Sequence, residues 1–433
     1  MSVALVERIR NHELTFGVIG VGYVGLTVAL ELARKNRVVA YDSNPDKIRL
    51  LRAGTSYVDG VSDSDIRESI ADRGLCPTGD ARELKGVDCF IVCVPTPLTV
   101  NKQPNLRHLA DAVELVAEYL RGDSVVIVES TTYPGTTEEF IRPKLEERGL
   151  VCGRDFYLAF SPERIDPGNE VFRFRNTTKV VGGAGRRAGE LAALIYRENL
   201  DCEIFTVSSP RAAEMSKILE NTYRNVNIGL INEFAMICHK MGISIWEVIE
   251  AAGTKPFGFQ TFYPGPGVGG HCIPIDPLYL TWKVKEYDMS ATMIEASGKI
   301  IEQMPDYIVG RIAELLNERG RAVKDSRILV LGAAYKSNVR DCRESPAIAV
   351  IRRLLRDQAR VDYYDPYVPE LEIGCKRLRS IRYADAGLSE YDLIVILTDH
   401  DGVDYGKLAS LSTPVFDTRN ALKEFRSDHI FRL

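Results

Sequence analysis

The sequence predicts an α/β protein with two doubly wound parallel sheets, and three observations indicate this fold class. The chain has 433 residues, about three times the usual 150-residue domain, so it should hold two or three domains. Apolar segments rich in β-branched residues alternate with helical segments in the first and last parts of the chain, which is typical of buried parallel strands. Between these parts, helical periodicity continues from Pro210 to about Met241. We therefore expect two Rossmann-like domains joined by a long central helix and a helical region.

The composition is that of a folded, slightly acidic protein. Hydrophobic residues make up 45% and charged residues 27% of the chain, which argues against the disordered, collagen-like and coiled-coil classes. The 55 Lys and Arg residues and the 60 Asp and Glu residues give a net charge of −5, so no overall positive field favours nucleic acid or anionic lipid. No uninterrupted apolar run reaches the roughly 18 residues that suggest a membrane span. We expect a soluble, cytoplasmic protein with no nucleic-acid or membrane partner.

The nine cysteines are scattered from Cys76 to Cys375. Their number is odd and no C-x-x-C pair occurs, so the sequence indicates neither a disulfide framework nor a zinc site. We expect each cysteine to be a free thiol, and we expect no metal.

The first domain is expected at residues 1–205. From Leu14, the sequence predicts a strand, a glycine turn, an amphipathic helix and a second strand. Further apolar runs at 88–95 and 124–130 predict strands, and the periodicity of Leu109–Leu120 predicts a helix.

A central helical region is expected at 206–305, and a second α/β domain at 306–433. After the long helix, Ser244 and Glu247 have the spacing of a capping box and predict the start of a second helix before Gly253. The α/β pattern then returns, with a strand at 326–336, a helix from Ser345 to Leu355, and strands at 360–366, 391–399 and 414–420.

The run Gly20-Val21-Gly22-Tyr23-Val24-Gly25 has the spacing of a dinucleotide-binding turn. The first glycine makes the tight turn, the second lets a pyrophosphate approach the helix N-terminus, and the third lets helix and strand pack closely. Asp42, at the end of the next strand, would accept hydrogen bonds from ribose hydroxyls. It would also repel a 2′-phosphate, and the two residues after it carry no charge, so NAD is favoured over NADP. The alternative is a tight structural turn.

The loop Tyr263–Pro277 contains four glycines and four prolines in fifteen residues. Proline restricts the backbone and glycine lets a ligand come close to it, so the loop should have a fixed shape. Within it, Cys272 is a nucleophile and Asp276 is a carboxylate four residues later. The alternatives are a buried thiol in a structural turn and, less well supported, a metal site formed by His271 and Cys272, for which no further Cys or His has ligand spacing.

Lys217 and Asn221 are four residues apart on the predicted long helix, so an ammonium and an amide share one face and could both contact one substrate oxygen. The alternative is a solvated lysine on the helix surface.

Polar residues also follow several predicted strands. Glu129–Thr132 ends one strand and Ser161–Glu163 ends another, at the edge where doubly wound sheets bind ligands, although turn chemistry alone explains such residues. In the last domain, Ala334–Lys336 leaves a strand and Arg343–Pro346 enters a helix, where a phosphate would be favoured.

These six motifs, in this order and across nearly the whole chain, resemble the UDP-glucose/GDP-mannose dehydrogenase family. The motifs are Gly20–Gly25, Ser130-Thr131, Ser161-Pro162-Glu163, Lys217 with Asn221, G-V-G-G-H-C-I-P-I-D, and Y-K followed by R-E-S-P. The resemblance implies an NAD domain (1–205), a central dimerisation region with the cysteine loop (206–305) and a UDP-sugar domain (306–433). It also implies a homodimer or higher homo-oligomer.

The family's reaction oxidises a sugar C6 alcohol to a carboxylate with two NAD and one water. By resemblance, the Cys272 thiolate adds to the intermediate aldehyde and forms a thiohemiacetal, then a thioester that water releases. The resemblance assigns oxyanion stabilisation to Lys217 and Asn221, proton transfer and water positioning to Asp276, and water-mediated acid–base work to Thr131 and Glu163. It implies NAD contacts from Gly20, Gly22, Tyr23, Val24, Gly25, Asp42, Pro95, Thr96, Thr131 and Arg343. It implies substrate contacts from Glu163, Lys217, Asn221, Tyr263, Gly269 and Lys336.

Two positions depart from the members specific for UDP-glucose. Ile275 stands where they carry a lysine, and Pro167 stands where they carry a second acid. The phrases S-P-E-R-I-D-P-G, T-K-P-F-G-F and G-G-H-C-I-P-I-D-P-L-Y-L-T-W-K resemble the branch that oxidises UDP-N-acetylhexosamines for bacterial surface polysaccharides. UDP-N-acetylglucosamine is the expected substrate, with the galactosamine and mannosamine epimers as alternatives. Arg340 stands where many members have an acid.

Two other classes of function compete with this one. One is a two-electron β-hydroxyacid dehydrogenase, which shares the plan of a Rossmann domain and a long helix. The other is a non-catalytic module that senses NAD. The cysteine loop and the third domain disfavour the first, and the joint presence of Cys272, Lys217, Asn221 and Asp276 disfavours the second.

Overall fold

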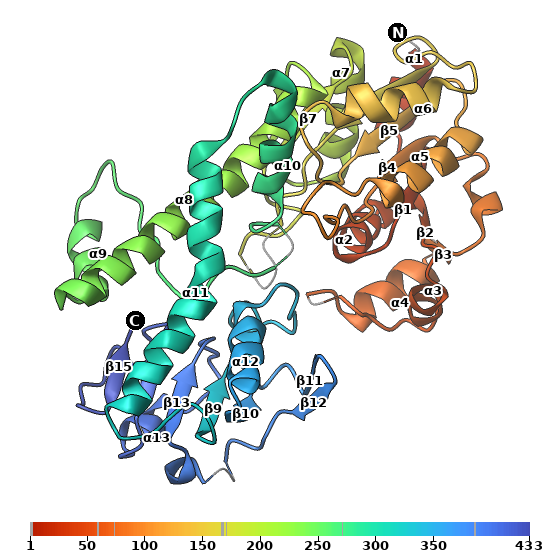
Figure 1. Ribbon diagram of the computed structural model, residues 1–433. Helices are drawn as coiled ribbons and strands as arrows, with labels where there is room; N and C mark the ends of the chain where they lie inside the picture. The colour runs from red at the N-terminus through yellow and green to blue at the C-terminus, as the bar shows by residue number, and fades with distance from the viewer. Residues whose placement is uncertain are drawn as a thin grey trace. The chain divides into compact units, whose positions relative to one another are not determined.

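The computed structural model describes residues 3–58, 60–72, 74–165, 169, 171–270, 272–384 and 387–433 (Figure 1). The chain divides into two compact units. The first unit comprises Met1–Glu220 and Leu278–Met289, and the second comprises Asn221–Pro277 and Ser290–Leu433. The three domains expected from the sequence, with boundaries at 205/206 and 305/306, stay a prediction.

The first unit contains an eight-stranded sheet in the order β3-β2-β1-β4-β5-β6-β7-β8. Its strands are β1 (Thr15–Ile19), β2 (Arg37–Tyr41), β3 (Leu75–Thr78), β4 (Cys89–Val92), β5 (Ser124–Val128), β6 (Phe156–Phe160), β7 (Lys179–Gly183) and β8 (Ile204–Val207). Neighbouring strands are parallel except β6 and β7, which are antiparallel. The expectation of parallel pairing is therefore wrong for this one pair. No crossover helix forms among the described residues between these two strands, and an antiparallel pair needs none.

Helices cover both faces of this sheet because its strands are apolar on both sides. Val125 and Ile127 of β5 pack in a cluster with α1 (Val3–Arg10), α2 (Tyr23–Ala33) and α7 (Arg186–Asn199). Val126 and Val128 face the other way. They pack in a cluster with residues of α5, of the π-helical turn after Thr136, and of α6, which span Arg107–Tyr119, Thr137–Ile141 and Arg142–Glu146. The remaining helices before α7 in the described ranges are α3 (Pro45–Arg52), α4 (Asp63–Ala71) and a short 3-10 helix at Ala81–Leu84.

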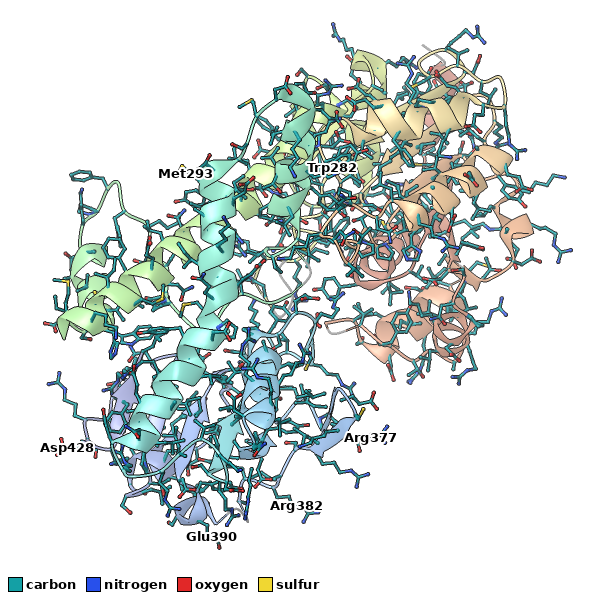
Figure 2. All side chains as sticks on the ribbon, viewed as in Figure 1. Trp282, Met293, Arg377, Arg382, Glu390 and Asp428 are labelled. Carbon is teal, nitrogen blue, oxygen red and sulfur yellow. The ribbon has the colours of Figure 1, made fainter. Side chains whose placement is uncertain are left out.

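The long central helix is confirmed as α8 (Pro210–Met241), and the boundary between the two units falls within it. It is followed by α9 (Ile245–Gly253), where the predicted N-cap Ser244 accepts a hydrogen bond from the N–H of Glu247. Helix α10 (Asp276–Lys283) begins in the second unit and continues into the first. There Trp282, labelled in Figure 2, packs on Tyr133 with ring centroids 5.0 Å apart.

The second unit contains a five-stranded parallel sheet in the order β10-β9-β13-β14-β15, and an antiparallel hairpin of β11 and β12. The strands are β9 (Arg327–Leu331), β10 (Arg360–Tyr364), β11 (Glu370–Ile373), β12 (Lys376–Arg379), β13 (Leu393–Ile396), β14 (Val415–Asp417) and β15 (Ile430–Arg432). Side chains Ile328 and Val330 of β9 pack in a cluster with α11 and α12, whereas Leu329 and Leu331 pack with Leu408 on the opposite face. These helices are α11 (Thr292–Asn317), α12 (Pro346–Arg356) and α13 (Tyr405–Ala409).

Helix α12 shows how the local sequence sets an element of this fold. Ser345 is its N-cap and Pro346 stands at the first helical position, where a missing N–H costs nothing. Ala347, Val350 and Leu354 are buried at helical spacing, so one face of the helix covers the sheet.

All nine cysteines are free thiols, as expected. Among the helices of the described residues, none combines the length and the apolarity that crossing a membrane would require.

Candidate functional site

The glycine turn of the first unit has the geometry that a dinucleotide-binding motif requires. Gly20 has a φ of +89° and donates its N–H to the carbonyl oxygen of Tyr41 at 2.8 Å. A Cβ atom added at Gly25 would lie 1.8 Å from the Gly20 carbonyl oxygen, whereas one added at Gly22 would meet nothing within 4 Å. The third glycine thus permits close packing and the second leaves open space at the N-terminus of α2, which Tyr23 and Val24 begin. This turn fits a pyrophosphate.

Asp42 follows β2 beside this turn, and it is 7% exposed. Its Oδ2 accepts the N–H of Val21 at 3.0 Å and its Oδ1 accepts the N–H of Asn44 at 2.9 Å. The ammonium of Lys47 also contacts Oδ2 at 2.9 Å. Sequence reasoning considered only the two residues after Asp42 and missed this cation, which lies in the first turn of α3. The N-cap of that helix, Asn44, was the available signal.

The strand ends of β4 and β5 are joined by Thr96 and Thr131, two expected NAD contacts. The Thr96 hydroxyl donates to the carbonyl oxygen of Thr131 at 2.7 Å, and the Tyr279 hydroxyl donates to the carbonyl oxygen of Thr96. Thr96 is buried and Pro95 beside it is exposed. The structure therefore brings the two threonines of the first sheet's carboxyl edge together.

Glu163 and Lys217 meet within the first unit. The Lys217 ammonium donates to the carbonyl oxygen of Glu163 at 2.6 Å, and Lys217 is only 6% exposed. The interpretation of Lys217 as a solvated surface lysine is therefore wrong. Burial raises the pKa of the Glu163 carboxyl above its usual value, although Lys217 and the N–H of Ile165 act against this rise.

Glu214, one turn before Lys217 on α8, is a positioning residue that sequence reasoning missed. It is fully buried, and its carboxylate accepts the N–H groups of Gly135 at 2.6 Å and of Thr137 at 2.8 Å. It therefore ties the segment after Thr131 to the helix that carries Lys217. Its helical spacing from Lys217 was a signal, but its partners are 77 and 79 residues away in sequence.

A second buried cluster lies at the end of β5. The Lys179 ammonium is 3.0 Å from Glu129 Oε2, and the Tyr196 hydroxyl donates to the other carboxylate oxygen. Lys179 also lies over the rings of Phe174 and Tyr196. The sequence indicates Glu129 only as a strand-end residue, and this pairing gives it a structural partner.

Three candidate catalytic residues come together in the second unit. The side-chain amide of Asn221 donates to the carboxylate of Asp276, and the N–H of Asp276 donates to the carbonyl oxygen of Cys272 at 2.8 Å. Asn221 and Asp276 are 8% and 2% exposed. The structure therefore places an amide and a carboxylate next to the backbone of the cysteine.

The glycines of the cysteine loop let other protein segments approach. A Cβ at Gly269 would lie 2.5 Å from Tyr335 Cβ, and a Cβ at Gly265 would lie 2.6 Å from the Arg419 guanidinium. Gly270 donates its N–H to the carbonyl oxygen of Arg343 at 2.9 Å. The cysteine loop packs against the segment that carries Tyr335 and Arg343, and this packing supports the fixed shape expected from the sequence. The groups that come close to these glycines are side chains of the protein itself.

Other expected contacts of the second unit have protein partners. The Arg343 guanidinium pairs with both carboxylate oxygens of Asp341, which raises the pKa of Arg343. The ring of Tyr263 is 62% exposed and stacks on Trp246 with centroids 6.3 Å apart. Lys336 lies in the segment that follows β9 and Gly332.

Three residues at the carboxyl edge of the second sheet were missed by sequence reasoning: Asp365, His400 and Arg419. Asp365 and Arg419 lie near the ends of predicted strands and His400 directly follows one, which was the available signal. The Arg419 Nε donates to the carbonyl oxygen of Leu397 at 2.9 Å, and burial lowers the pKa of this guanidinium. Asp365 and His400 form a buried pair.

Some expected residues fall outside these contacts. Pro167 and His271, and with His271 the metal interpretation, lie outside the described residues. Ile275 donates its N–H to the carbonyl oxygen of Cys272 at 3.1 Å. Arg340 lines an open cavity of about 510 Å³ with Cys342, Tyr367 and residues of β11, and nothing in the structure explains the choice of arginine there. Across the part of the chain that the structure describes, no cluster of three or more His, Cys, Asp or Glu side chains is arranged to hold a metal ion.

Comparison with known families identifies all three parts of the chain. Three models of the UDP-glucose/GDP-mannose dehydrogenase family match: the NAD binding domain at residues 14–200, the central domain at 211–302 and the UDP binding domain at 329–424. The expectation of NAD as cofactor is confirmed by the first of these matches.

Individual relatives cover nearly the whole chain. A UDP-N-acetyl-D-glucosamine 6-dehydrogenase of Pseudomonas aeruginosa is 35% identical over 423 residues, 96% of this chain and 99% of that protein. A UDP-N-acetyl-D-mannosamine dehydrogenase of Pyrococcus horikoshii is 35% identical over 426 residues, 97% of this chain and 98% of that protein. The solved structure of a UDP-D-ManNAc dehydrogenase from Pyrococcus horikoshii has a TM-score of 0.88 at 34% identity, covering 97% of this chain and 98% of that chain. Since the family's models match every part of the chain in order, and its relatives match nearly end to end, the chain belongs to the UDP-glucose/GDP-mannose dehydrogenase family of NAD-dependent enzymes.

Proposed function

We propose that the protein oxidises the C6 hydroxyl of UDP-N-acetylglucosamine to a carboxylate, with two NAD and one water, in the cytoplasmic synthesis of surface polysaccharide. The observation that carries this proposal is the arrangement around Cys272. Asn221, from α8, donates to Asp276, and Asp276 donates to the backbone of Cys272. A nucleophile, an amide donor and a carboxylate are the groups that oxidation of an aldehyde through a covalent adduct requires.

NAD, when bound at the glycine turn, supplies the hydride acceptor for both oxidations. Loss of a hydride from C6 and of the hydroxyl proton first converts the alcohol to an aldehyde. The Cys272 thiolate then adds to the C6 carbonyl carbon, so a C–S bond forms and negative charge moves to the oxygen. The Lys217 ammonium and the Asn221 amide stabilise that oxyanion. The thioester formed by the second oxidation is attacked by a water that Asp276 positions. The C–S bond then breaks, Cys272 leaves as a thiolate, and the sugar acid is released.

Proton transfer in this scheme falls to Glu163 and Thr131. Burial raises the pKa of Glu163. The shift moves the pKa toward neutral pH, and a carboxyl whose pKa is close to the working pH can both accept and release a proton. Lys336 holds the sugar nucleotide. The resemblance also assigns Arg343 to NAD, and in the structure its guanidinium pairs with the carboxylate of Asp341.

The preference for a UDP-N-acetylhexosamine over UDP-glucose rests on Ile275 and on the relatives. An apolar Ile275 removes the lysine that members specific for UDP-glucose carry. We expect a kcat/KM for UDP-N-acetylglucosamine at least about tenfold above that for UDP-glucose, since a pocket built for an acetamido group loses about 1–3 kcal/mol when it is empty. UDP-N-acetylmannosamine is the second candidate, because a relative of equal identity carries that name.

A panel of UDP-N-acetylglucosamine, its galactosamine and mannosamine epimers and UDP-glucose tests this proposal, with NADH counted per sugar. Two NADH per UDP-N-acetylglucosamine is the expected result. One NADH would indicate a two-electron dehydrogenase and none an NAD-sensing module. Equal or better turnover of UDP-glucose would show that Ile275 and Pro167 were misinterpreted.

We propose further that the protein is a homodimer that pairs through α8. Apolar side chains at helical spacing on the second-unit part of this helix are exposed: Tyr223, Leu230, Phe234, Ile237 and Met241. Several exposed apolar side chains on one helix favour contact with another protein surface. Light scattering of the wild type and of Phe234→Asp tests it. A dimer that becomes a monomer is expected, and a wild-type monomer would overturn it.

A further inference from the structure

A buried Asp–His pair occupies the carboxyl edge of the second sheet. Asp365 directly follows β10, and His400 lies four residues after β13. His400 Nε2 is 3.0 Å from Asp365 Oδ2, and neither side chain is exposed to solvent. The ring of Tyr367 lies against the imidazole, with centroids 5.2 Å apart. No role in the proposed reaction involves either residue, so the pair needs its own explanation.

The hydrogen bonds fix the protonation of His400. The backbone N–H of Asn338 donates to His400 Nδ1 at 3.0 Å, and a backbone N–H can only donate, so Nδ1 carries a lone pair. The proton of the neutral imidazole is therefore on Nε2, which donates to the Asp365 carboxylate. Although burial raises the pKa of Asp365, the bonds from His400, Ala333 and Ala334 bring it below its usual value.

The pair holds both ends of one short segment, 333–338. Asp365 Oδ2 accepts the N–H groups of Ala333 at 2.7 Å and Ala334 at 2.9 Å. His400 accepts the N–H of Asn338 at the other end. Lys336 stands between these anchors. The shape of the backbone that presents Lys336 is therefore set by three N–H groups that converge on one carboxylate and its imidazole partner.

The same segment supports the cysteine loop. Tyr335 packs so closely on Gly269 and Gly270 that a Cβ at either position would lie 2.5 or 3.0 Å from a Tyr335 carbon. These glycines precede Cys272 by three and two residues. A change in the shape of 333–338 would therefore move Lys336 and the backbone wall of the cysteine loop together.

We propose that Asp365 and His400 are positioning residues for the UDP-sugar, which shape the 333–338 segment so that Lys336 can hold the nucleotide and Tyr335 can support the cysteine loop. This inference rests on the proposed function, because Lys336 is taken to contact the UDP-sugar. The pair acts through the segment and does not touch the reacting atoms.

Three substitutions of His400 separate the two bonds of the imidazole. His400→Leu removes both bonds. His400→Asn keeps an acceptor near the position of Nδ1 and loses the donor to Asp365. His400→Gln carries an amide oxygen and nitrogen with nearly the spacing of the two ring nitrogens, so it can restore both bonds. Tyr391→Phe is the matched control, since it removes a part-buried hydrogen bond to Asp362 near the amino end of β13 in the same sheet.

The expected result is a split between the two substrates. His400→Leu should raise the KM for UDP-N-acetylglucosamine about tenfold or more and leave the KM for NAD within about twofold. His400→Asn should be intermediate, His400→Gln should recover to within about threefold of the wild type, and Tyr391→Phe should change neither KM. Equal rises in both KM values, or a glutamine variant as poor as the leucine variant, would overturn the proposal. If His400→Leu does not fold, the comparison of His400→Asn with His400→Gln decides in the same way.

Two measurements stand apart from turnover. Amide hydrogen exchange at 333–338 should accelerate in His400→Leu and return towards wild type in His400→Gln, and the alkylation rate of Cys272 by iodoacetamide should change in the same order. Unchanged exchange would overturn the positioning role even in an active enzyme. If the wild type oxidised no UDP-hexosamine, the proposed function would fail, while the exchange experiment would still test the positioning role.

Discussion

The turn after β1 in the first unit and the turn after β9 in the second unit have the same backbone geometry. Gly20 has a φ of +89° and donates its N–H to Tyr41 at 2.8 Å, and Gly332 has a φ of +86° and donates to Tyr364 at 2.9 Å. In both units an aspartate follows the neighbouring strand and accepts an N–H from the turn: Asp42 from Val21 and Asp365 from Ala333.

The two turns diverge after the first glycine. In the first unit, Gly22 leaves open space and α2 begins at the next residue. In the second unit, the equivalent position is Ala334, and α12 does not begin until Pro346. Asp42 accepts the N–H groups of Val21 and Asn44 and pairs with the Lys47 ammonium. Asp365 instead contacts backbone amides and His400.

One local architecture can thereby serve two different ligands. A short glycine turn exposes the N-terminus of a helix and suits a pyrophosphate. In the second unit the turn is eleven residues longer before the helix begins. This longer turn presents side chains, among them Lys336 and Arg343, in place of the helix N-terminus. The aspartate changes role with it, from a candidate ribose acceptor to an internal anchor.

The largest expected effect lies at the second turn, where the cysteine loop packs. Cys272→Ala should lower the rate of sugar-acid formation by a factor of roughly 10³ or more, because the variant lacks the thiolate that forms the covalent adduct. NAD binding, measured by calorimetry, should be unchanged, since the first turn is untouched. Cys272→Ser should accumulate a covalent ester, which mass spectrometry would detect. Acid formation by the alanine variant at near the wild-type rate would show that the loop beside the second turn does not carry the covalent chemistry.

Gly22→Ala makes the first turn resemble the second. An added Cβ meets no protein atom within 4 Å, so thermal stability should hold, but the methyl group would occupy the space of the pyrophosphate. We expect the KM for NAD to rise about tenfold or more, and the KM for the UDP-sugar to stay constant. Ala334→Gly is the reciprocal control and should gain no NAD binding. An unchanged KM for NAD would show that open space at Gly22 is not what admits the cofactor.

Asp42→Asn tests the different roles of the two aspartates. It removes the repulsion of a 2′-phosphate and leaves the Lys47 ammonium, so the preference for NAD over NADP in kcat/KM should fall about tenfold. Lys47→Met should have the opposite effect, since the unneutralised carboxylate repels a phosphate more strongly. A preference that neither substitution alters would place cofactor choice elsewhere.

The smallest effect is on stability as a function of pH. Burial raises the pKa of Glu163 in the folded first unit, so its contribution is fully present below the unfolded pKa of about 4.3 and is lost as pH rises through the folded value. The pKa of Asp365 is lowered despite burial, through its bonds with His400, Ala333 and Ala334. Its contribution is present above an unfolded pKa of about 3.9 and is lost as pH falls through the folded value.

Melting curves between pH 3 and pH 8 would measure how the stability of the protein changes with pH in the wild type and in each variant. Glu163→Gln should remove a loss of stability on the alkaline side, and Asp365→Asn should remove a loss on the acidic side. Slopes of the same sign for the two variants would contradict the opposite shifts.

The periodicity of the sequence determined the fold class, because buried parallel strands and amphipathic helices leave patterns that depend on neighbouring residues alone. Hence β5 and α8 were predicted at nearly the observed residues. The antiparallel pairing of β7 with β6 was not predicted. All five residues of β7 are buried, so its sequence carries no sign of strand direction, which is set by how the intervening chain returns to the sheet.

The candidate site was predicted by residue type and spacing, and its roles remain predictions. The local sequence determines the positions of Gly20, Gly25 and Asp42, because all three lie in one turn or at the end of a strand beside it. The burial of Lys217 could not be read from its helix, because the partner is a carbonyl 54 residues away at Glu163.

The amino-acid sequence alone specified which chemical groups the protein carries and which family they resemble, because the order and spacing of motifs along the chain are properties of the sequence itself. Which of these groups meet was decided by tertiary packing. Asn221 meets Asp276 across 55 residues, Glu214 meets Gly135 across 79, and His400 meets Asp365 across 35. The physical reason is that hydrogen bonds between strand ends and helices depend on sheet order, and sheet order is a property of the whole packed core rather than of any segment.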